Sequence, residues 1–95
     1  ASLKVLYLFA STPGEQRSGS DISAVLGLAS GTLYPILARF ETNGILKSEW
    51  ENIEPSRAGR PRRRYYQLTP YGVSFATEQM HALEMQVQVE QALLA

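Results

Sequence analysis

The most concentrated group of functional side chains in this sequence is a run of basic residues, which would bind a polyanion. More than half of the nine Lys and Arg residues lie within residues 57–64, as Arg57, Arg60, Arg62, Arg63 and Arg64. Burial would strip each unpaired guanidinium of its hydration, so the run must project into solvent or onto an anionic partner. We expect that partner to be the phosphate backbone of double-stranded DNA.

The segment Gly59-Arg60-Pro61-Arg62 at the centre of this run has the composition of a minor-groove contact. Proline favours an extended backbone, and the negative potential of a narrow minor groove attracts arginine. We therefore expect Arg60 and Arg62 to grip the minor groove or the phosphates beside it. The alternative is a solvated loop that attracts anions without specificity.

Arg63 and Arg64 open a segment with strand character, and neighbouring side chains of a strand point to opposite faces. The two arginines therefore cannot do the same work. We expect one of them to pair with Glu49 or Glu51 across a hairpin.

A helix-turn-helix is predicted upstream of the basic run. Ile22 and Leu26 lie one helical turn apart, Gly27 supplies a turn, and Leu33 and Ile36 continue an apolar face on the next helix. This spacing packs two short helices at a steep angle and leaves the outer face of the second free for a major groove.

The exposed positions near the start of that second helix are small or hydroxylated, which suits contacts to phosphates and base edges. The alternative is that Ser30 and Thr32 merely cap the helix while Tyr34 packs on the wing. The candidate DNA-binding residues are Ser20, Ser30, Gly31, Thr32, Tyr34, Arg39, Arg60, Arg62, Arg63 and Arg64.

Three helices are expected before the basic run. Residues 2–11 are apolar nearly all round, which favours a covered helix. Ser20 or Asp21 is placed to cap the second helix, and Ser30 the third, which closes at residues 43–44. Pro35 is expected within about the first turn of the third helix, where a missing amide costs little.

Two strands and a long helix follow. Residues 45–53 and 63–69 alternate as strands and predict a two-stranded hairpin, or wing, with a long basic loop. Trp50 on this hairpin is expected to be a core residue. Thr69-Pro70 is a strong helix start, and the helix is predicted to run to residue 95.

The final helix carries an apolar stripe spaced by threes and fours, as in a coiled-coil seam. A second copy of the chain is the expected cover, because a two-fold dimer matches palindromic DNA. Packing back on the first helix would account for about a third of the stripe. The predicted dimerisation residues are Val73, Ala76, Met80, Leu83, Val87 and Leu94.

Composition narrows the class of protein. The net charge is zero, yet residues 1–72 hold every Lys and Arg, whereas the charged residues within 73–95 are all glutamates. Without cysteine, and with His81 as the sole histidine, no metal site, cofactor site or nucleophile–base pair is expected, so no enzyme is predicted. The apolar run at residues 3–10 is too short to cross a membrane, and the cytoplasm is the default compartment.

Several segments together resemble the PadR family of transcriptional regulators: Ser30-Gly31-Thr32-Leu33-Tyr34-Pro35-Ile36-Leu37, Asn43-Gly44-Ile45-Leu46, Glu49-Trp50, Gly59-Arg60-Pro61 and Tyr65-Tyr66-Gln67-Leu68-Thr69-Pro70-Tyr71-Gly72. The resemblance implies a prokaryotic cytoplasmic protein that is dimeric through its C-terminal helix and usually represses transcription. It also implies a possible small-molecule effector near the dimer interface.

The sequence therefore predicts a mainly α protein with a small β-hairpin. Residues 1–69 would form a winged helix-turn-helix DNA-binding domain and residues 70–95 a C-terminal dimerisation helix. The expected function is sequence-specific regulation, by repression, from a palindromic operator. The alternative is a winged-helix interaction module whose basic wing docks an acidic protein partner.

Overall fold

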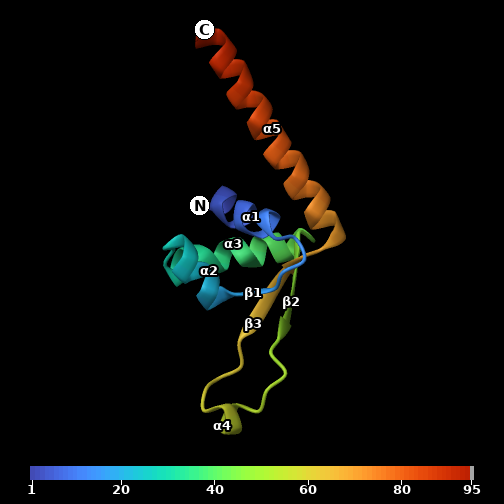
Figure 1. Ribbon diagram of the computed structural model, residues 1–95. Coiled ribbons are helices and arrows are strands. Elements are labelled where there is room, and N and C mark those ends of the chain that lie inside the picture. The colour runs from blue at the N-terminus through green and yellow to red at the C-terminus, as the bar shows by residue number, and fades with distance from the viewer. Residues whose placement is uncertain (95) are drawn as a thin grey trace.

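Helices cover one side of a small antiparallel sheet, and a hairpin and a long helix leave this body in opposite directions (Figure 1). The computed structural model describes residues 1–94 and measures 61 × 26 × 20 Å along its principal axes. Its elements are α1 (Ser2–Ser11), β1 (Arg17–Ser18), α2 (Gly19–Leu26), α3 (Ser30–Thr42), β2 (Leu46–Trp50), α4 (Pro55–Ala58), β3 (Arg64–Leu68) and α5 (Pro70–Leu94).

The core lies where α1, α2, α3 and the inner face of the sheet meet. Several large apolar side chains in it are almost completely buried, because the apolar positions of the helices recur at helical spacing and face inward, toward the inner face of the sheet. They are Val5, Phe9, Ile22, Leu33, Leu37 and Leu46. The mainly α fold with a small sheet is as predicted, and the core holds the helix-turn-helix in place.

The helix ends differ in part from the sequence-based expectation. Ser18, rather than Ser20 or Asp21, caps α2: its hydroxyl accepts the Asp21 amide at 3.2 Å. α3 has Ala29 at its N-cap, so Ser30 is the first helical residue and makes no cap bond. Gly27 does end α2 as predicted, in the left-handed conformation with φ 65°.

Pro35 lies inside α3, in its second turn, and not within the first turn as expected. A proline there removes the amide that would donate to the carbonyl of Gly31. Gly31 is exposed at the start of the helix, so water can satisfy its carbonyl.

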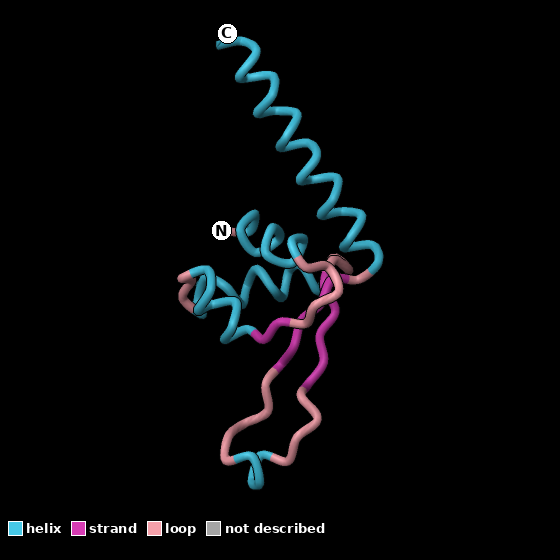
Figure 2. The backbone as a smooth tube through the Cα atoms, in the orientation of Figure 1, coloured by secondary structure: helices cyan, strands magenta, loops and turns pink. Residues whose placement is uncertain are grey.

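The sheet has three strands in the order β1-β3-β2, one more than the predicted hairpin (Figure 2). β1 spans two residues, too few to show an alternating pattern, and it pairs Arg17 with Tyr66. Strands β2 and β3 pair as expected, with Leu46 opposite Leu68, Ser48 opposite Tyr66 and Trp50 opposite Arg64.

The loop between β2 and β3 reaches beyond the body and carries a short helix at its tip (Figure 2). α4 begins with Pro55 and ends at Gly59, which adopts the left-handed conformation with φ 69°. A single turn of helix was not predicted, because four residues show no periodicity. Strands β2 and β3 and this loop, residues 46–68, together form the wing.

One joint connects the wing, α3 and α5. The Thr69 hydroxyl accepts the Gly72 amide at 2.9 Å, which confirms the predicted cap of α5, and it also donates to the carbonyl of Gly44. The Thr69 amide donates to the Ile45 carbonyl at 3.1 Å. A β-carbon at Gly72 would overlap the same carbonyl oxygen, so only glycine fits.

α5 uses the first part of its apolar stripe within the chain. Ala76 is 1% exposed and belongs to the core, and Val73 and Met80 pack against it. Ala76 thus presents almost no surface to a partner helix, and the share of the stripe used internally is larger than expected. Leu83, Val87 and Leu94 remain exposed. Residue 95, the predicted end of this helix, lies outside the described residues.

No helix within residues 1–94 combines the length and the apolar character needed to span a membrane.

Candidate nucleic-acid interface

The first half of α3 presents the exposed face that the sequence predicted. Ser30, Gly31, Thr32 and Tyr34 are exposed, while Leu33 on the other side of the helix is fully buried. Open space surrounds the position where a β-carbon at Gly31 would sit. This end of α3 is narrow and unobstructed, as a helix that enters a groove of DNA must be.

Tyr34 leans toward the start of α2. A β-carbon at Gly19 would lie 2.5 Å from the Tyr34 hydroxyl oxygen, so the ring occupies the space that glycine leaves free. Ser20 is exposed beside it, with its hydroxyl 3.2 Å from that of Ser18. Arg39 is further along α3, and its guanidinium donates to the Ser2 hydroxyl at 2.9 Å, at the end of α3 away from this surface.

Arg60 is held within the wing by Glu51. Its two terminal nitrogens donate to the two carboxylate oxygens, Nη1 to Oε1 at 2.6 Å and Nη2 to Oε2 at 2.8 Å. The Arg63 amide also donates to Glu51 Oε1 at 3.3 Å. The hydrogen bonds from Arg60 lower the pKa of Glu51 from 4.5 to about 2, and the same pair raises the pKa of Arg60.

A second arginine connects the wing to α3. Arg64 Nε donates to the Ser48 hydroxyl at 2.9 Å, the Ser48 hydroxyl donates to Glu41 of α3, and Arg64 Nη2 lies 3.4 Å from the same carboxylate. The guanidinium carbon of Arg64 also lies 5.1 Å from the ring centroid of Trp50. The expected acidic partner was Glu49 or Glu51, but the one found is Glu41.

The remaining wing arginines are directed outward. Arg62 and Arg63 are exposed, and within residues 1–94 no carboxylate lies within ion-pair distance of either guanidinium. Arg62 Nε donates to the Ile53 carbonyl at 2.9 Å, which leaves its terminal nitrogens for a partner. Arg57 on α4 pairs with Glu54 at 3.1 Å in full solvent.

Trp50 is exposed rather than buried, so the expectation of a core residue is wrong. Its exposed fraction is 59%, because the end of β2 extends past the helices that cover Leu46 at the other end. The alternation placed Trp50 on the inner face correctly. The sequence carried no signal that the core stops before that point.

These elements line one groove of about 370 Å³. The start of α2, Tyr34 of α3 and the base of the wing contribute to it. Its lining is Ser18, Gly19, Ser20, Tyr34, Trp50, Arg62, Arg63, Arg64 and Tyr66. Three of the four predicted wing arginines and two of the predicted helix residues therefore meet in one place. Burial raises the pKa of the Tyr66 hydroxyl at its floor.

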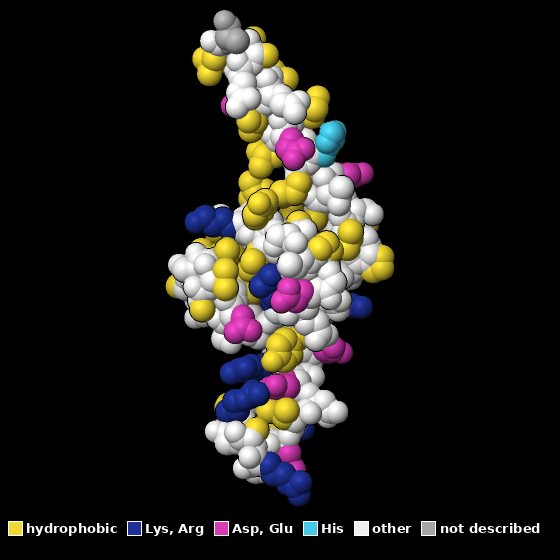
Figure 3. Space-filling view, in the orientation of Figure 1, with side chains coloured by type: hydrophobic (Ala, Val, Ile, Leu, Met, Phe, Trp, Pro, Cys, Tyr) yellow, Lys and Arg dark blue, Asp and Glu magenta, His cyan; other side chains and the backbone are white. Residues whose placement is uncertain are grey.

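The space-filling view shows how the charges are distributed. Basic side chains gather on the wing, whereas hydrophobic side chains follow α5 on the far side of the body (Figure 3). The cationic wing and the exposed apolar side chains of α5 thus lie at opposite ends of the molecule (Figure 3), which separates the predicted nucleic-acid surface from the predicted dimerisation surface.

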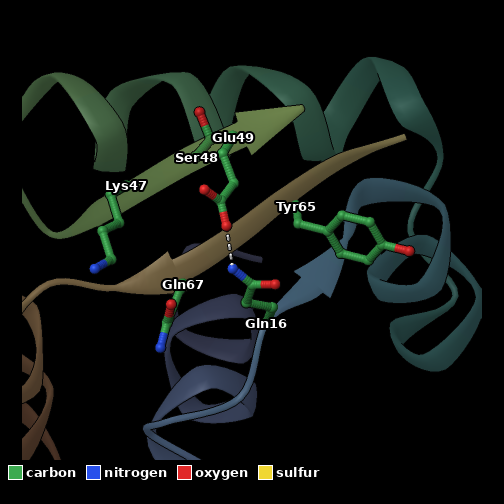
Figure 4. Close-up of a pocket in the computed structure, with 6 residues that line it drawn as sticks. All are labelled: Gln16, Lys47, Ser48, Glu49, Tyr65 and Gln67. Atoms are coloured by element: carbon green, nitrogen blue, oxygen red, sulfur yellow. Dashed lines mark hydrogen bonds between the residues drawn. The ribbon is translucent and has the colours of Figure 1, made fainter. Parts of the chain in front are cut away.

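A smaller hollow of about 100 Å³ lies by the sheet, lined by Gln16, Lys47, Ser48, Glu49, Tyr65 and Gln67 (Figure 4). The Gln16 side-chain amide points toward the Glu49 carboxylate and donates to it at 2.5 Å (Figure 4). The Gln67 amide donates to the Gly14 carbonyl at 3.0 Å. These bonds attach the segment before β1 to the sheet.

Within residues 1–94, no group of three or more His, Asp or Glu side chains is placed to hold a metal ion.

Comparison with known proteins gives consistent matches. A family model described as the transcriptional regulator PadR-like family matches residues 20–78, which is more than half of the chain. Transcriptional regulator Rv3488 of Mycobacterium tuberculosis (strain ATCC 25618 / H37Rv) is 44% identical over 57 residues. That match covers 60% of this chain and 49% of the relative, so the chain spans about half the length of the curated protein it matches.

Solved structures match along most of the chain. A PadR-like transcription factor from Bacteroides fragilis is 27% identical with a TM-score of 0.78, covering 97% of this chain and 87% of that one. A PadR family transcriptional regulator from Eggerthella lenta DSM 2243 is 26% identical with a TM-score of 0.78, covering 96% and 81%. The similarity includes the helical body, the wing and the long last helix.

Proposed function

Since this chain belongs to the PadR-like family of transcriptional regulators, we propose that it binds operator DNA as a homodimer and represses transcription. The family is one of regulators and not of enzymes, in agreement with the chemistry expected from the sequence. The observation that supports the proposal best is the shared groove: Tyr34 of α3, the start of α2 and three wing arginines all line it.

In this proposal the first half of α3 enters the major groove. Ser30 and Thr32 offer hydroxyls to base edges and phosphates, and Gly31 allows the backbone to come close. Arg62 and Arg63 of the wing reach the minor groove or its phosphates, since their guanidinium groups have no acidic partner within the described chain. Arg60 and Arg64 hold the wing in position, because each is already engaged with a carboxylate.

The exposed part of the α5 stripe supports the dimer. Leu83, Met85, Val87, Val89, Leu93 and Leu94 are large apolar side chains with 41–88% of their surface in solvent. Leu83, Val87 and Leu94 are spaced to lie on one face of α5, and the other three side chains lie on another face. Exposed apolar surface of this extent is normally covered, and the spacing of Leu83, Val87 and Leu94 suits a second helix. Two subunits related by a two-fold axis would present two α3 helices to a palindromic operator.

A small-molecule effector near the dimer interface, as the family resemblance implies, would act by changing the distance between the two α3 helices. Such a regulator would work in the cytoplasm, where prokaryotic DNA lies.

The test begins with a gel shift at low salt against a duplex of random sequence, followed by selection of the preferred sequence from a random pool. We expect binding to the random duplex, which weakens with salt, and selection of a palindrome with half-sites about one helical turn apart. Light scattering of the free protein should give the mass of a dimer. Failure to bind duplex DNA at low salt, together with capture by an acidic protein surface, would favour the interaction-module alternative.

A further inference from the structure

We propose that the groove between the start of α2 and the wing seats the sugar–phosphate backbone of one DNA strand, and that the Trp50 indole contacts its deoxyribose units. This inference rests on the proposed DNA-binding function and adds to it a contact residue outside the recognition helix and the arginine run.

Trp50 is as exposed as a side chain that contacts a partner, and it is not part of the hydrophobic core. It is the only tryptophan of the chain, and 59% of it lies in solvent at the open end of β2. Arg64 covers one part of the ring at 5.1 Å and leaves the rest free. Covering exposed indole surface stabilises a complex, and tryptophan is enriched in binding interfaces.

Two hollows meet at this side chain. One is the groove toward α2, and the other is a shallow hollow beside the wing loop. Both have Trp50 and Arg62 in their linings. Pro55 and Pro61 complete the second hollow, whose lining is therefore mostly apolar. An apolar rim with a guanidinium beside it matches a backbone in which apolar sugars alternate with phosphates.

Charge favours DNA as the occupant. The groove lining contains Arg62, Arg63 and Arg64, of which Arg64 is already paired with Glu41, and it includes no acidic side chain among the described residues. The hydroxyls of Ser20 and Tyr34 add neutral donors on the opposite wall. Hydrogen-bond donors without a neighbouring carboxylate attract phosphodiester groups. A DNA strand fits this groove better than an acidic protein surface does, because its phosphates recur at regular spacing and can contact several arginines.

Position favours the backbone over the bases. Tyr34 belongs to α3, so a strand lying in this groove runs directly beside the helix that reads the bases. In helix-turn-helix complexes, a recognition helix in the major groove brings the flanking strand against neighbouring elements. The groove is where that strand would pass, and the contact would be independent of base sequence.

The test uses the native chain, because its single tryptophan reports on the groove directly. Tryptophan emission, excited at the red edge to avoid tyrosine, is followed while a random-sequence duplex is added at low salt, and accessibility is measured with the neutral quencher acrylamide. A gel shift on parallel samples measures binding. We expect a blue shift and a severalfold fall in the quenching constant at saturation, because the strand would cover the indole.

Variants make the contribution quantitative. Trp50→Ala should weaken binding by about tenfold, the value of covering the exposed part of one indole, whereas Trp50→Phe should keep most of the affinity. Tyr71→Ala is the matched control, since Tyr71 is also 59% exposed but lies at the start of α5. We expect Tyr71→Ala to bind like the native chain.

The outcomes separate the two proposals. A gel shift with unchanged quenching of Trp50, or equal affinities for Trp50→Ala and Tyr71→Ala, would overturn the role of Trp50 and leave DNA binding intact. Absence of any gel shift would instead overturn the proposed function.

Discussion

Glu51 and Arg60 form a two-pronged ion pair across the wing, with oxygen–nitrogen distances of 2.6 and 2.8 Å. The pair joins the strand side of the loop, which leaves β2, to the segment that returns toward β3. It fixes the conformation of a long loop. It also distinguishes Arg60, which is paired, from Arg62 and Arg63, which look equivalent to it in the sequence but have no acidic partner for their guanidinium groups among the described residues.

The pH dependence of this pair has a defined direction. The pKa of Glu51 in the folded chain is about 2, below the usual value of 4.5, because Arg60 donates to the charged form. Glu51 therefore stabilises the folded wing above pH 4.5, and this contribution is lost as the pH falls through about 2. We expect a carbon-detected NMR titration of the Glu51 carboxyl to show this low pKa. In Arg60→Ala the pKa should return toward 4.5; an unchanged value would contradict the assigned cause.

The wing arginines should differ in the salt dependence of DNA binding. Arg63→Ala is expected to reduce the slope of log affinity against log salt by about 0.9, the effect of losing one phosphate contact. Arg60→Ala should weaken binding through a looser wing, with a much smaller change of slope, because Glu51 already neutralises Arg60. Fluorescence anisotropy at several salt concentrations measures both. Equal flattening by the two variants would show that Arg60 leaves Glu51 for a phosphate.

Thr32 is expected to contribute to sequence preference. Its side chain is exposed in the first turn of α3, and a single hydrogen bond from its hydroxyl to a base edge is worth about 1 kcal/mol. Thr32→Ala should therefore change the ranking of operator variants, while Thr32→Ser, which keeps the hydroxyl, should preserve most of it. A panel of single-base operator variants provides the measurement. Identical rankings for the native chain and Thr32→Ala would exclude a base contact.

The exposed stripe on α5 should control oligomeric state. Val87→Glu places a charge in the proposed seam and is expected to weaken dimerisation at least tenfold, since a buried charge without a partner is costly. Gln88→Glu adds the same charge one residue along, on a different face of the helix, and should leave the dimer intact. Analytical ultracentrifugation compares the two. Truncation after Tyr71 would be a poorer test, because it also removes Ala76 from the core.

Two glycines should respond to alanine in opposite directions. At Gly72 a β-carbon would overlap the Ile45 carbonyl oxygen, so Gly72→Ala is expected to cost about 3 kcal/mol by forcing α5 away from the body. At Gly31 nothing lies within 4 Å, and Gly31→Ala should gain about 0.5–1 kcal/mol from lower backbone entropy in a helix. Urea denaturation gives both values. A neutral effect at Gly72 would mean that the joint is not tight.

The sequence was informative where periodicity or turn chemistry is strong. The spacing of Leu33 and Ile36, the left-handed glycine at residue 27 and the Thr69-Pro70 start all led to the correct elements. Elements shorter than a full period were missed: β1 is two residues long and α4 four. Neither has enough residues to produce a pattern.

Contacts between distant residues were the other limit. The partner of Arg64 is Glu41, which lies on a different element and is separated from it by the whole of β2. The exposure of Trp50 depends on where the helical core ends, and alternation along β2 cannot show that. The candidate arginines were identified as a group, but their separation into paired and free members came only from three-dimensional neighbours.

The joint at Thr69 makes the last helix a lever. Gly72 leaves no gap against Ile45, and the Thr69 hydroxyl is bonded on both sides, so these contacts set the angle between α5 and the body that holds α3. α5 has 25 residues. Over a length of about 37 Å, a tilt of about 10° at this pivot carries the tip through roughly 6 Å. In a paired assembly, small angular changes at one threonine would therefore set how far apart the two subunits hold their reading ends.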